Sequence, residues 1–217
     1  WAVLFGCDKA PSENAAPATV PSPPAAGVIV CMGDSLTAGY GVDEDQAYPA
    51  LLETRLRDDG LAYRVINAGV SGETSSGALA RIEWVVSSLA PDIVILETGA
   101  NDGLRGLDPA LLESNLKELV VRLKGHGIQV ILAGMLMLPN LGPEYTRAFA
   151  EIYPRVADEL DVLLIPFFLE GVAGTVNMNQ PDRLHPTAKG YARIVDTIYP
   201  VVITAIEGHQ ATIAGSS

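Results

Sequence analysis

Ser35 stands where a serine could act as a nucleophile. It follows Gly33 and Asp34 at the end of an apolar run, residues 28–32, which is typical of a strand buried on both faces. Gly33 permits a tight turn, and Asp34 is a residue type that begins helices. A serine at such a turn lies at the carboxyl end of a parallel sheet, where open α/β folds bind their ligands.

His185 is the candidate base for this serine, because a hydroxyl is a poor nucleophile until a base takes its proton. Asp182 stands three residues before His185, close enough in a tight turn to hydrogen-bond the ring nitrogen that faces away from Ser35. His126 and His209 have no carboxylate at that upstream spacing. The sequence therefore predicts a catalytic triad of Ser35, His185 and Asp182.

Acyl transfer also needs hydrogen-bond donors for the oxyanion of the tetrahedral intermediate. Two further turns that follow predicted strands, residues 68–74 and 98–103, supply candidates. The backbone N–H groups of Ser35 and Gly72 and the side-chain amide of Asn101 are suitable donors. We predict that these groups form the oxyanion hole, because the carboxyl ends of parallel strands meet at one edge of a sheet.

Each of these turns has a simpler interpretation when it is taken alone. Gly72 could be a turn glycine, residues 101–103 an ordinary turn, and His185 a polar helix start. Other serines compete with Ser35 by composition, although none follows a strand–Gly–Asp turn: Ser71, Ser75 and Ser76. Only the combination of the turns points to acyl transfer.

The elements that must position these residues alternate between strand and helix. Apolar runs predict four further strands, at residues 63–67, 93–96, 128–132 and 162–165. Helical spacing predicts helices at residues 48–56, 79–89, 111–124 and 145–160, and a last one from Pro186 to about residue 206. This order predicts a three-layer α/β/α fold with a doubly wound, parallel five-stranded sheet. No Gly-x-Ser-x-Gly elbow occurs, which argues against the ordinary α/β-hydrolase plan.

Length and composition limit the possible functions. The 217 residues suit one folded domain, assigned to residues 27–206, with an N-terminal arm over residues 1–26 and a flexible tail over residues 207–217. The net charge of −12 argues against nucleic acid as a partner and against purely electrostatic attachment to anionic lipid. Cys31 is interpreted as a small core residue. No Cys/His clusters with zinc spacing occur, so no metal is predicted.

The N-terminal arm has the features of an export signal. Leu4, Gly6 and Cys7 resemble the Leu-x-Gly-Cys box of bacterial lipoproteins, in which the cysteine receives a lipid. A plain secretory signal and a cloning remnant are the alternatives. Residues 8–26 are rich in Pro, Ala and Ser, which is typical of an extended tether. We therefore expect a periplasmic or secreted protein, with a possible membrane tether through a lipidated Cys7.

Four blocks of the sequence resemble the blocks of the SGNH (GDSL) hydrolase superfamily: residues 33–36 (Gly-Asp-Ser-Leu), Gly72, residues 99–102 (Gly-Ala-Asn-Asp) and Asp182-x-x-His185. Longer runs resemble its bacterial thioesterase I, lysophospholipase and arylesterase branch: residues 33–40, 101–106, 152–154 and 166–168. The resemblance covers residues 27 to about 206. It implies a flavodoxin-like sheet, a Ser-Asp-His triad, no cofactor and a broad range of ester and thioester substrates. Many members of the superfamily are periplasmic.

We therefore expect a monomeric serine esterase that works through an acyl-enzyme on Ser35. Its expected substrates are aryl esters, short- to medium-chain acyl esters, acyl-coenzyme A and lysophospholipids. The acyl chain is expected against apolar residues of the loops. The candidates, for which core or loop packing is an equal alternative, are Leu104, Leu107, Leu138, Leu141 and Phe168.

Two alternatives remain open at the level of sequence. A carbohydrate acetylesterase on the same scaffold needs a polar sugar cleft, and an aromatic content of 6% gives that little support. A non-catalytic flavodoxin-like binding module, for flavin phosphate for instance, needs a phosphate-cradling loop after the first strand. It would also leave the placing of Asp182 beside His185 without a reason.

Overall fold

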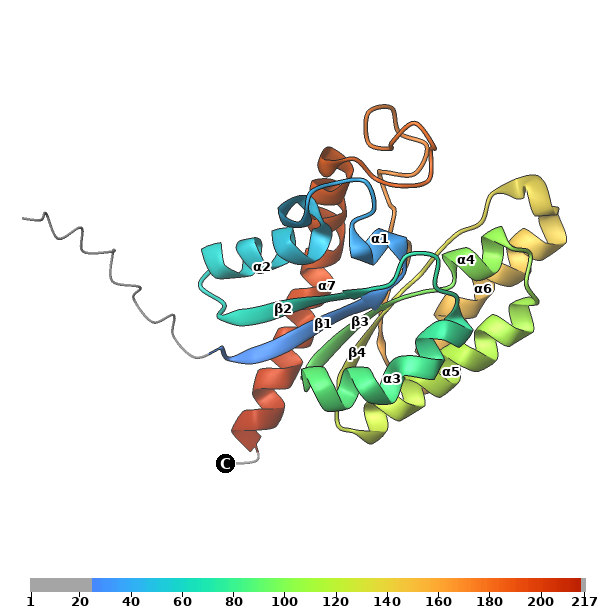
Figure 1. Ribbon diagram of the computed structural model, residues 1–217. Helices are drawn as coiled ribbons and strands as arrows, with labels where there is room; N and C mark the ends of the chain where they lie inside the picture. Colours follow the sequence, from blue (N-terminus) through green and yellow to red (C-terminus); the bar gives the residue numbers. More distant parts are fainter. Residues whose placement is uncertain (1–24, 216–217) are drawn as a thin grey trace, which may run out of the picture.

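A parallel sheet of five strands forms the centre of the molecule (Figure 1). This computed structural model describes residues 25–215, so the predicted signal with Cys7 and nearly all of the tether lie outside the described residues. The strands follow in chain order: β1 (Gly27–Gly33), β2 (Tyr63–Gly69), β3 (Ile93–Glu97), β4 (Gln129–Ala133) and β5 (Leu163–Ile165). Their order in the sheet is β2-β1-β3-β4-β5, and every neighbouring pair is parallel.

Helices cover both faces of this sheet. On one face, α2 (Tyr48–Asp58) packs beside α7 (Ala188–Gly215) (Figure 1). The other face carries α3 (Ser75–Leu89), α5 (Pro109–Gly125) and α6 (Pro143–Leu160) (Figure 1). All five residues of β3 are buried, as expected of a central strand that is covered on both faces. The predicted three-layer, doubly wound fold is confirmed.

The last helix differs from the prediction at both ends. It begins at Ala188 rather than Pro186, because Pro186 pairs with Asn179 in an isolated β-bridge. The N–H of Gly190 donates to Thr187 Oγ1 at 3.3 Å, so a threonine caps the first turn. At the other end, the helix continues to Gly215 rather than ending near residue 206.

Short helices that the periodicity could not reveal complete the described part of the chain. Two of them follow strands directly: α1 (Ser35–Ala38) after β1 and α4 (Ala100–Leu104) after β3. The other two are 3₁₀ helices in loops: η1 (Glu44–Gln46) and η2 (Pro139–Leu141). Each spans only one turn, which is too short to show a helical repeat in the sequence.

The strand order places the turns after β1 and β3 side by side. From β1 the chain continues to β2 on one side, and from β3 it continues to β4 on the opposite side. The segments that follow β1 and β3 therefore lead in opposite directions along the sheet. Doubly wound folds bind ligands at such a point. Gly33 allows the end of β1 to lie close to the end of β3, because a Cβ at this position would lie 2.5 Å from the backbone oxygen of Glu97.

Candidate active site

Ser35, His185 and Asp182 form a continuous chain of hydrogen bonds. The Oγ atom of Ser35 lies 2.9 Å from Nε2 of His185. The other ring nitrogen, Nδ1, lies 2.7 Å from Oδ2 of Asp182. Ser35 begins α1, and His185 lies 150 positions further along the chain, shortly before the start of α7. The contacts are those that the sequence predicts, and they fit a serine, its base and the carboxylate that orients the base.

The turn that carries His185 is organised by Asp182. One oxygen of Asp182, Oδ1, accepts hydrogen bonds from the N–H groups of Leu184 at 2.9 Å and His185 at 3.0 Å. The other oxygen accepts from the ring, and this hydrogen bond is the largest of the causes that lower the pKa of Asp182 to about 2. The carboxylate is therefore charged at neutral pH, and the ring of His185 has a fixed orientation.

Tyr40 covers the ring of His185. Their ring centroids are 4.6 Å apart, and the planes are inclined by 41°. The backbone oxygen of Tyr40 accepts a hydrogen bond from Gln180 Nε2 at 2.7 Å, which ties the segment after α1 to the turn of His185. Because Tyr40 is 54% exposed, its ring forms part of the site's surface and not of the core.

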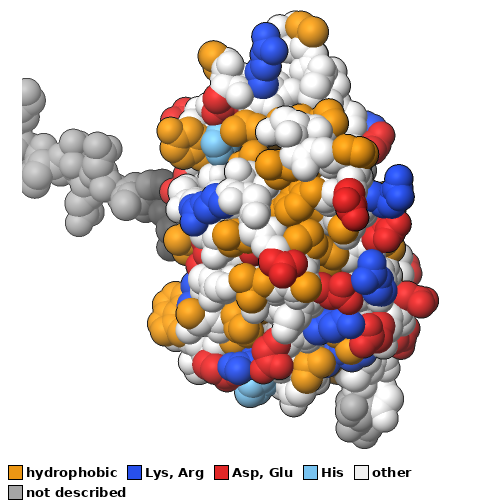
Figure 2. Space-filling model, turned by 90° about the vertical axis from the view of Figure 1, so that its right-hand side faces the viewer, with side chains coloured by type: hydrophobic (Ala, Val, Ile, Leu, Met, Phe, Trp, Pro, Cys, Tyr) orange, Lys and Arg blue, Asp and Glu red, His pale blue; other side chains and the backbone are white. Residues whose placement is uncertain are grey.

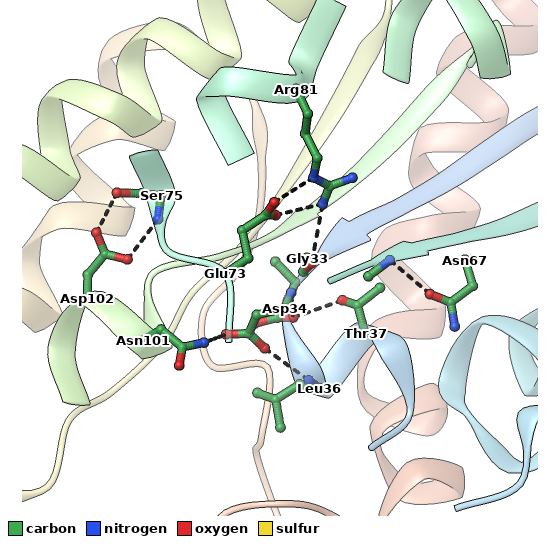
Figure 3. Close-up of polar contacts among 12 residues, drawn as sticks. Gly33, Asp34, Leu36, Thr37, Asn67, Glu73, Ser75, Arg81, Asn101 and Asp102 are labelled. Atoms are coloured by element: carbon green, nitrogen blue, oxygen red, sulfur yellow. Dashed lines mark hydrogen bonds and ion pairs between the residues drawn. The ribbon is translucent and has the colours of Figure 1, made fainter. Parts of the chain in front are cut away.

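The predicted oxyanion donors line one cavity of about 740 Å³ together with the triad. Asn101, in the first turn of α4, donates from Nδ2 to Oδ2 of Asp34 at 2.9 Å (Figure 3). The other oxygen, Oδ1, accepts from the N–H of Leu36 at 2.9 Å and caps α1. An amide nitrogen carries two hydrogens, so Asn101 keeps one for a ligand in the cavity.

Gly72 lies in the loop before α3, with a left-handed backbone at φ +80°. Its carbonyl oxygen accepts from Arg105 Nη2 at 2.7 Å. The next residue, Glu73, makes a two-bond ion pair with Arg81, with both distances 2.7 Å (Figure 3). Arg81 also donates to the carbonyl oxygen of Gly33 at 3.4 Å. These contacts hold the loop of Gly72 against the end of β1.

Asp102 holds the neighbouring helices together. It accepts from the N–H of Ser75 at 2.8 Å and from the Ser75 hydroxyl, at the start of α3 (Figure 3). Asn115 of α5 donates to the same hydroxyl at 2.9 Å. Asp102 follows Asn101 directly, so this buried network fixes the position of α4 and of the amide that it carries.

A further buried carboxyl group, that of Glu97, contacts the turn of Ser35. Its Oε2 accepts from Thr37 Oγ1 at 2.8 Å and from the N–H of Asp34 at 3.3 Å. Oε1 has no hydrogen-bond partner among the described residues. Burial raises the pKa of Glu97 well above its usual value, and the charge of Asp34 adds to this effect.

Asp34 is the ionised member of this carboxyl pair. Burial raises the pKa of Asp34 as well, but the hydrogen bonds from Leu36 and Asn101 act in the opposite direction. Both oxygens of Asp34 accept donors, whereas one oxygen of Glu97 accepts none. Burying a charged carboxylate costs less free energy when both of its oxygens accept hydrogen bonds. Glu97 is therefore the neutral acid of the pair.

Hydrophobic side chains form most of the cavity wall. The candidates Leu104 and Leu138 line it, but Leu107 and Leu141 do not. Phe168 is wrong as a candidate, because its ring is fully buried against Tyr48 with centroids 5.2 Å apart. Loop residues not named from the sequence complete the wall: Met135, Leu136, Met137, Phe167 and Leu169. Figure 2 shows hydrophobic side chains gathered around a histidine near the top of one face and continuing toward its middle.

Other candidates from the sequence lie elsewhere or lack a base. Among the described serines, Ser35 is the one whose hydroxyl lies within hydrogen-bond distance of a histidine. His126 is exposed at the end of α5. His209 contacts Tyr63 and Asp92 at the start of β2 and β3, away from the carboxyl ends of the strands. Within residues 25–215, no group of three His, Cys, Asp or Glu side chains could hold a metal ion.

Comparisons with known proteins identify the family of the chain. Residues 31–193 match the GDSL-like Lipase/Acylhydrolase family. The chain is 42% identical to "Esterase TesA" of Pseudomonas aeruginosa, over 82% of this chain and 89% of the relative. It is 37% identical to "Thioesterase 1/protease 1/lysophospholipase L1" of Escherichia coli K12, over 79% of this chain and 81% of the relative. A crystal structure of TesA superposes with a TM-score of 0.79 at 40% identity, covering 82% of this chain and 99% of that one.

Proposed function

Because the chain belongs to the GDSL-like lipase/acylhydrolase family, we propose that Ser35, His185 and Asp182 carry out its reaction. The protein is a carboxylic ester hydrolase, and its relatives include esterases and a thioesterase. The observation that carries the assignment of residues is the 2.9 Å contact between Ser35 Oγ and His185 Nε2, with Asp182 on the far side of the ring. Both distances are within hydrogen-bond range, which supports the roles of nucleophile, base and orienting carboxylate.

The first half of the reaction forms an acyl-enzyme. His185 takes the hydroxyl proton as Ser35 Oγ attacks the carbonyl carbon, and the carbonyl oxygen becomes an oxyanion. The N–H groups of Ser35 and Gly72 and the amide of Asn101 donate to this oxygen. The tetrahedral intermediate then collapses, and His185 gives its proton to the leaving alcohol or thiol.

The second half of the reaction restores the free enzyme. His185 takes a proton from water, and the water oxygen attacks the acyl carbon on Ser35. The same donors hold the second oxyanion, and Ser35 leaves with the proton from His185. Asp182 remains charged throughout, because its pKa is about 2. Its part is to stabilise and orient the imidazolium.

The cavity favours acyl esters over acetylated sugars. The wall beside the site is built from apolar loop residues such as Leu104, Leu136 and Leu138, whereas a sugar ring needs polar partners along a cleft. Its size suits short- to medium-chain acyl groups. The alternative of a flavin-phosphate module is disfavoured, because the Ser35 hydroxyl is engaged by His185 and does not face an open phosphate cradle.

The proposed location is the periplasm or the outside of the cell, with the protein acting as a monomer. The Leu-x-Gly-Cys box at Leu4, Gly6 and Cys7 supports export and a lipid on Cys7. In the described part of the chain, no helix is long and apolar enough to cross a membrane. Mass spectrometry of protein from its own host would test the lipid. An unmodified, uncleaved N-terminus would exclude it.

Hydrolysis of p-nitrophenyl esters from acetate to palmitate tests the proposed chemistry. Ser35→Ala should lose at least about 1,000-fold in kcat. Ser71→Ala is the matched control, because Ser71 lines the same cavity without a contact to His185, and it should keep the activity of the wild type. Equal activity in Ser35→Ala and wild type would overturn the proposal. A preference for acetate alone would favour the carbohydrate acetylesterase.

A further inference from the structure

Arg183 lines the reaction cavity without being used by the proposed chemistry. It stands between Asp182 and His185, and its side chain is exposed at the cavity. No hydrogen bond or ion pair engages its guanidinium within residues 25–215. The arginines at the same edge of the sheet differ in this respect, because Arg81 is paired with Glu73 and Arg105 is bonded to the carbonyl of Gly72.

The backbone at Arg183 is held in a conformation that an arginine does not favour. Its φ is +62°, in the left-handed region. The N–H of Arg183 donates to the oxygen of Gln180 at 2.9 Å, and Asp182 holds the next two N–H groups. Glycine would adopt this turn without steric cost. A strained residue that keeps a large side chain beside a reacting group points to a use for that side chain.

The carboxylates around the cavity do not neutralise Arg183. Asp182 is engaged by His185, and Asp34 is engaged by Asn101. Glu73 is engaged by Arg81. The guanidinium is therefore a free positive charge at the site of a chain whose net charge is −12.

The reaction itself fixes which part of the substrate lies near Arg183. His185 has to reach the leaving oxygen or sulfur in order to protonate it. Besides its triad partners, the cavity residues that neighbour His185 are Tyr40, which contacts its ring, and Arg183 and Leu184, which precede it in the chain. The leaving group therefore lies against this surface, and the acyl chain lies against the apolar loop wall.

We propose that Arg183 determines specificity by binding an anionic group, above all a phosphate, on the leaving alcohol or thiol. The planar guanidinium matches a phosphate with two parallel hydrogen bonds, which an ammonium group cannot do. The phosphate could belong to a coenzyme A thioester or to a monoacyl phospholipid, and the chemistry of recognition is the same. This inference rests on the proposed function, because it assigns the leaving-group side from the role of His185.

The test compares substrates that share the reacting bond and differ in whether the leaving group carries phosphate. The thioester pair is butanoyl-coenzyme A and S-butanoyl-N-acetylcysteamine. The ester pair is 1-decanoyl-lysophosphatidylglycerol and 1-decanoylglycerol, both used below their micelle concentrations. The readout is the ratio of kcat/KM between the anionic and the neutral member. In wild type this ratio should exceed one, and it should fall as the salt concentration rises.

Arg183→Gln should reduce this ratio about tenfold in at least one pair, mainly through a higher KM, and Arg183→Lys should restore part of it. Arg64→Gln is the control, since Arg64 is an exposed arginine in the early part of β2, and it should leave the ratio unchanged. The pair that responds identifies the source of the phosphate.

Two results would overturn the inference. One is a wild-type ratio at or below one in both pairs. The other is an equal loss on both members of each pair in Arg183→Gln, because that loss would mean that Arg183 only shapes the turn of His185. Failure of the proposed function is seen separately, as Ser35→Ala with full activity on the neutral substrates.

Discussion

Asn101 donates a side-chain hydrogen bond to Asp34, with 2.9 Å between Nδ2 and Oδ2. The bond joins the first turn of α4 to the residue that immediately precedes Ser35. Asp34 at the same time caps α1, on which Ser35 lies. One carboxylate thus fixes the nucleophile and an oxyanion donor relative to each other before any charge develops, which is the condition for efficient electrostatic stabilisation.

Replacing Asp34 by asparagine should slow the chemical step. The variant offers Asn101 a weaker, neutral acceptor, so the amide is less firmly aimed at the oxyanion. We expect kcat to fall about 10- to 100-fold, less than the loss of a whole donor, with KM nearly unchanged. Steady-state kinetics with p-nitrophenyl butyrate measures both constants.

Asp108→Asn is the matched control for this prediction. Asp108 also caps a helix, because it accepts from the N–H of Ala110 at 2.9 Å, but it is exposed at the start of α5. Its replacement should leave kcat unchanged. A kcat for Asp34→Asn equal to that of wild type would show that the Asn101 amide needs no such support.

Gly72→Ala should impair catalysis through the backbone. A Cβ at Gly72 would meet no atom closer than Arg105 Nη2 at 3.7 Å, so there is no clash. The cost comes from φ +80°, at about 1 to 2 kcal/mol for a residue with a side chain. Relaxation of this strain would turn the N–H away from the oxyanion, and we expect a lower kcat as well as a lower stability.

Gly60→Ala separates the two effects. Gly60 has the same φ of +80°, and no atom lies within 4 Å of a Cβ there, but it lies in the turn before β2. Both variants should lose similar stability in urea unfolding, whereas only Gly72→Ala should lose turnover. The same kcat in Gly72→Ala and Gly60→Ala would show that the N–H of Gly72 is not part of the oxyanion hole.

Glu97→Gln should change how stability depends on pH. The pKa of Glu97 is raised above its ordinary value of 4.5, so the native state keeps a proton that the unfolded state releases. Wild type therefore loses stability as pH rises above about 4.5 toward the raised pKa. Glutamine does not titrate, so the stability of the variant relative to wild type should increase over that interval.

Urea unfolding of both proteins between pH 4 and pH 8 measures this difference. Glu118→Gln is a suitable comparison, because Glu118 is an exposed partner of Arg122 and lies far from the buried pair. Parallel pH curves for wild type and Glu97→Gln would mean that Glu97 is ionised in the folded protein.

The ion pair of Glu73 and Arg81 should be costly to break. The two side chains are only 7% and 18% exposed, so removing one partner leaves a largely buried charge. We expect Arg81→Met to destabilise the fold by about 3 kcal/mol. Adding Glu73→Gln should recover part of this loss, and a double-mutant cycle in urea measures the coupling. Strictly additive effects would show that the pair does not act as a unit.

The sheet and the triad could be predicted because their signals are local. Continuous apolar runs mark buried parallel strands, and the turns that follow them collect at one edge by topology alone. Ser35 and His185 could therefore be paired across 150 positions without knowledge of any contact between them. The spacing of Asp182 and His185 is likewise readable, because it fits within one turn.

The support of the site could not be predicted, because it depends on register between distant segments. Glu97 left a signal, namely a charged residue at the end of the apolar run of β3. Its contact with Thr37 follows only from the pairing of β1 with β3. The choice of Phe168 over Phe167 failed for a related reason. Which of two neighbouring rings faces the core depends on how the loop after β5 turns, and in the fold Phe168 lies in the core whereas Phe167 lines the cavity.

The apolar wall of the cavity has a consequence for how this scaffold can change. Leu136 and Leu138 come from the loop after β4, and Leu104 lies 50% exposed at the end of α4. None of their side chains takes part in the hydrogen bonds that hold the reacting groups. The preferred length of the acyl chain can therefore change through substitution of single leucines in this wall, in evolution or in the laboratory. The hydrogen bonds of the reacting groups stay the same.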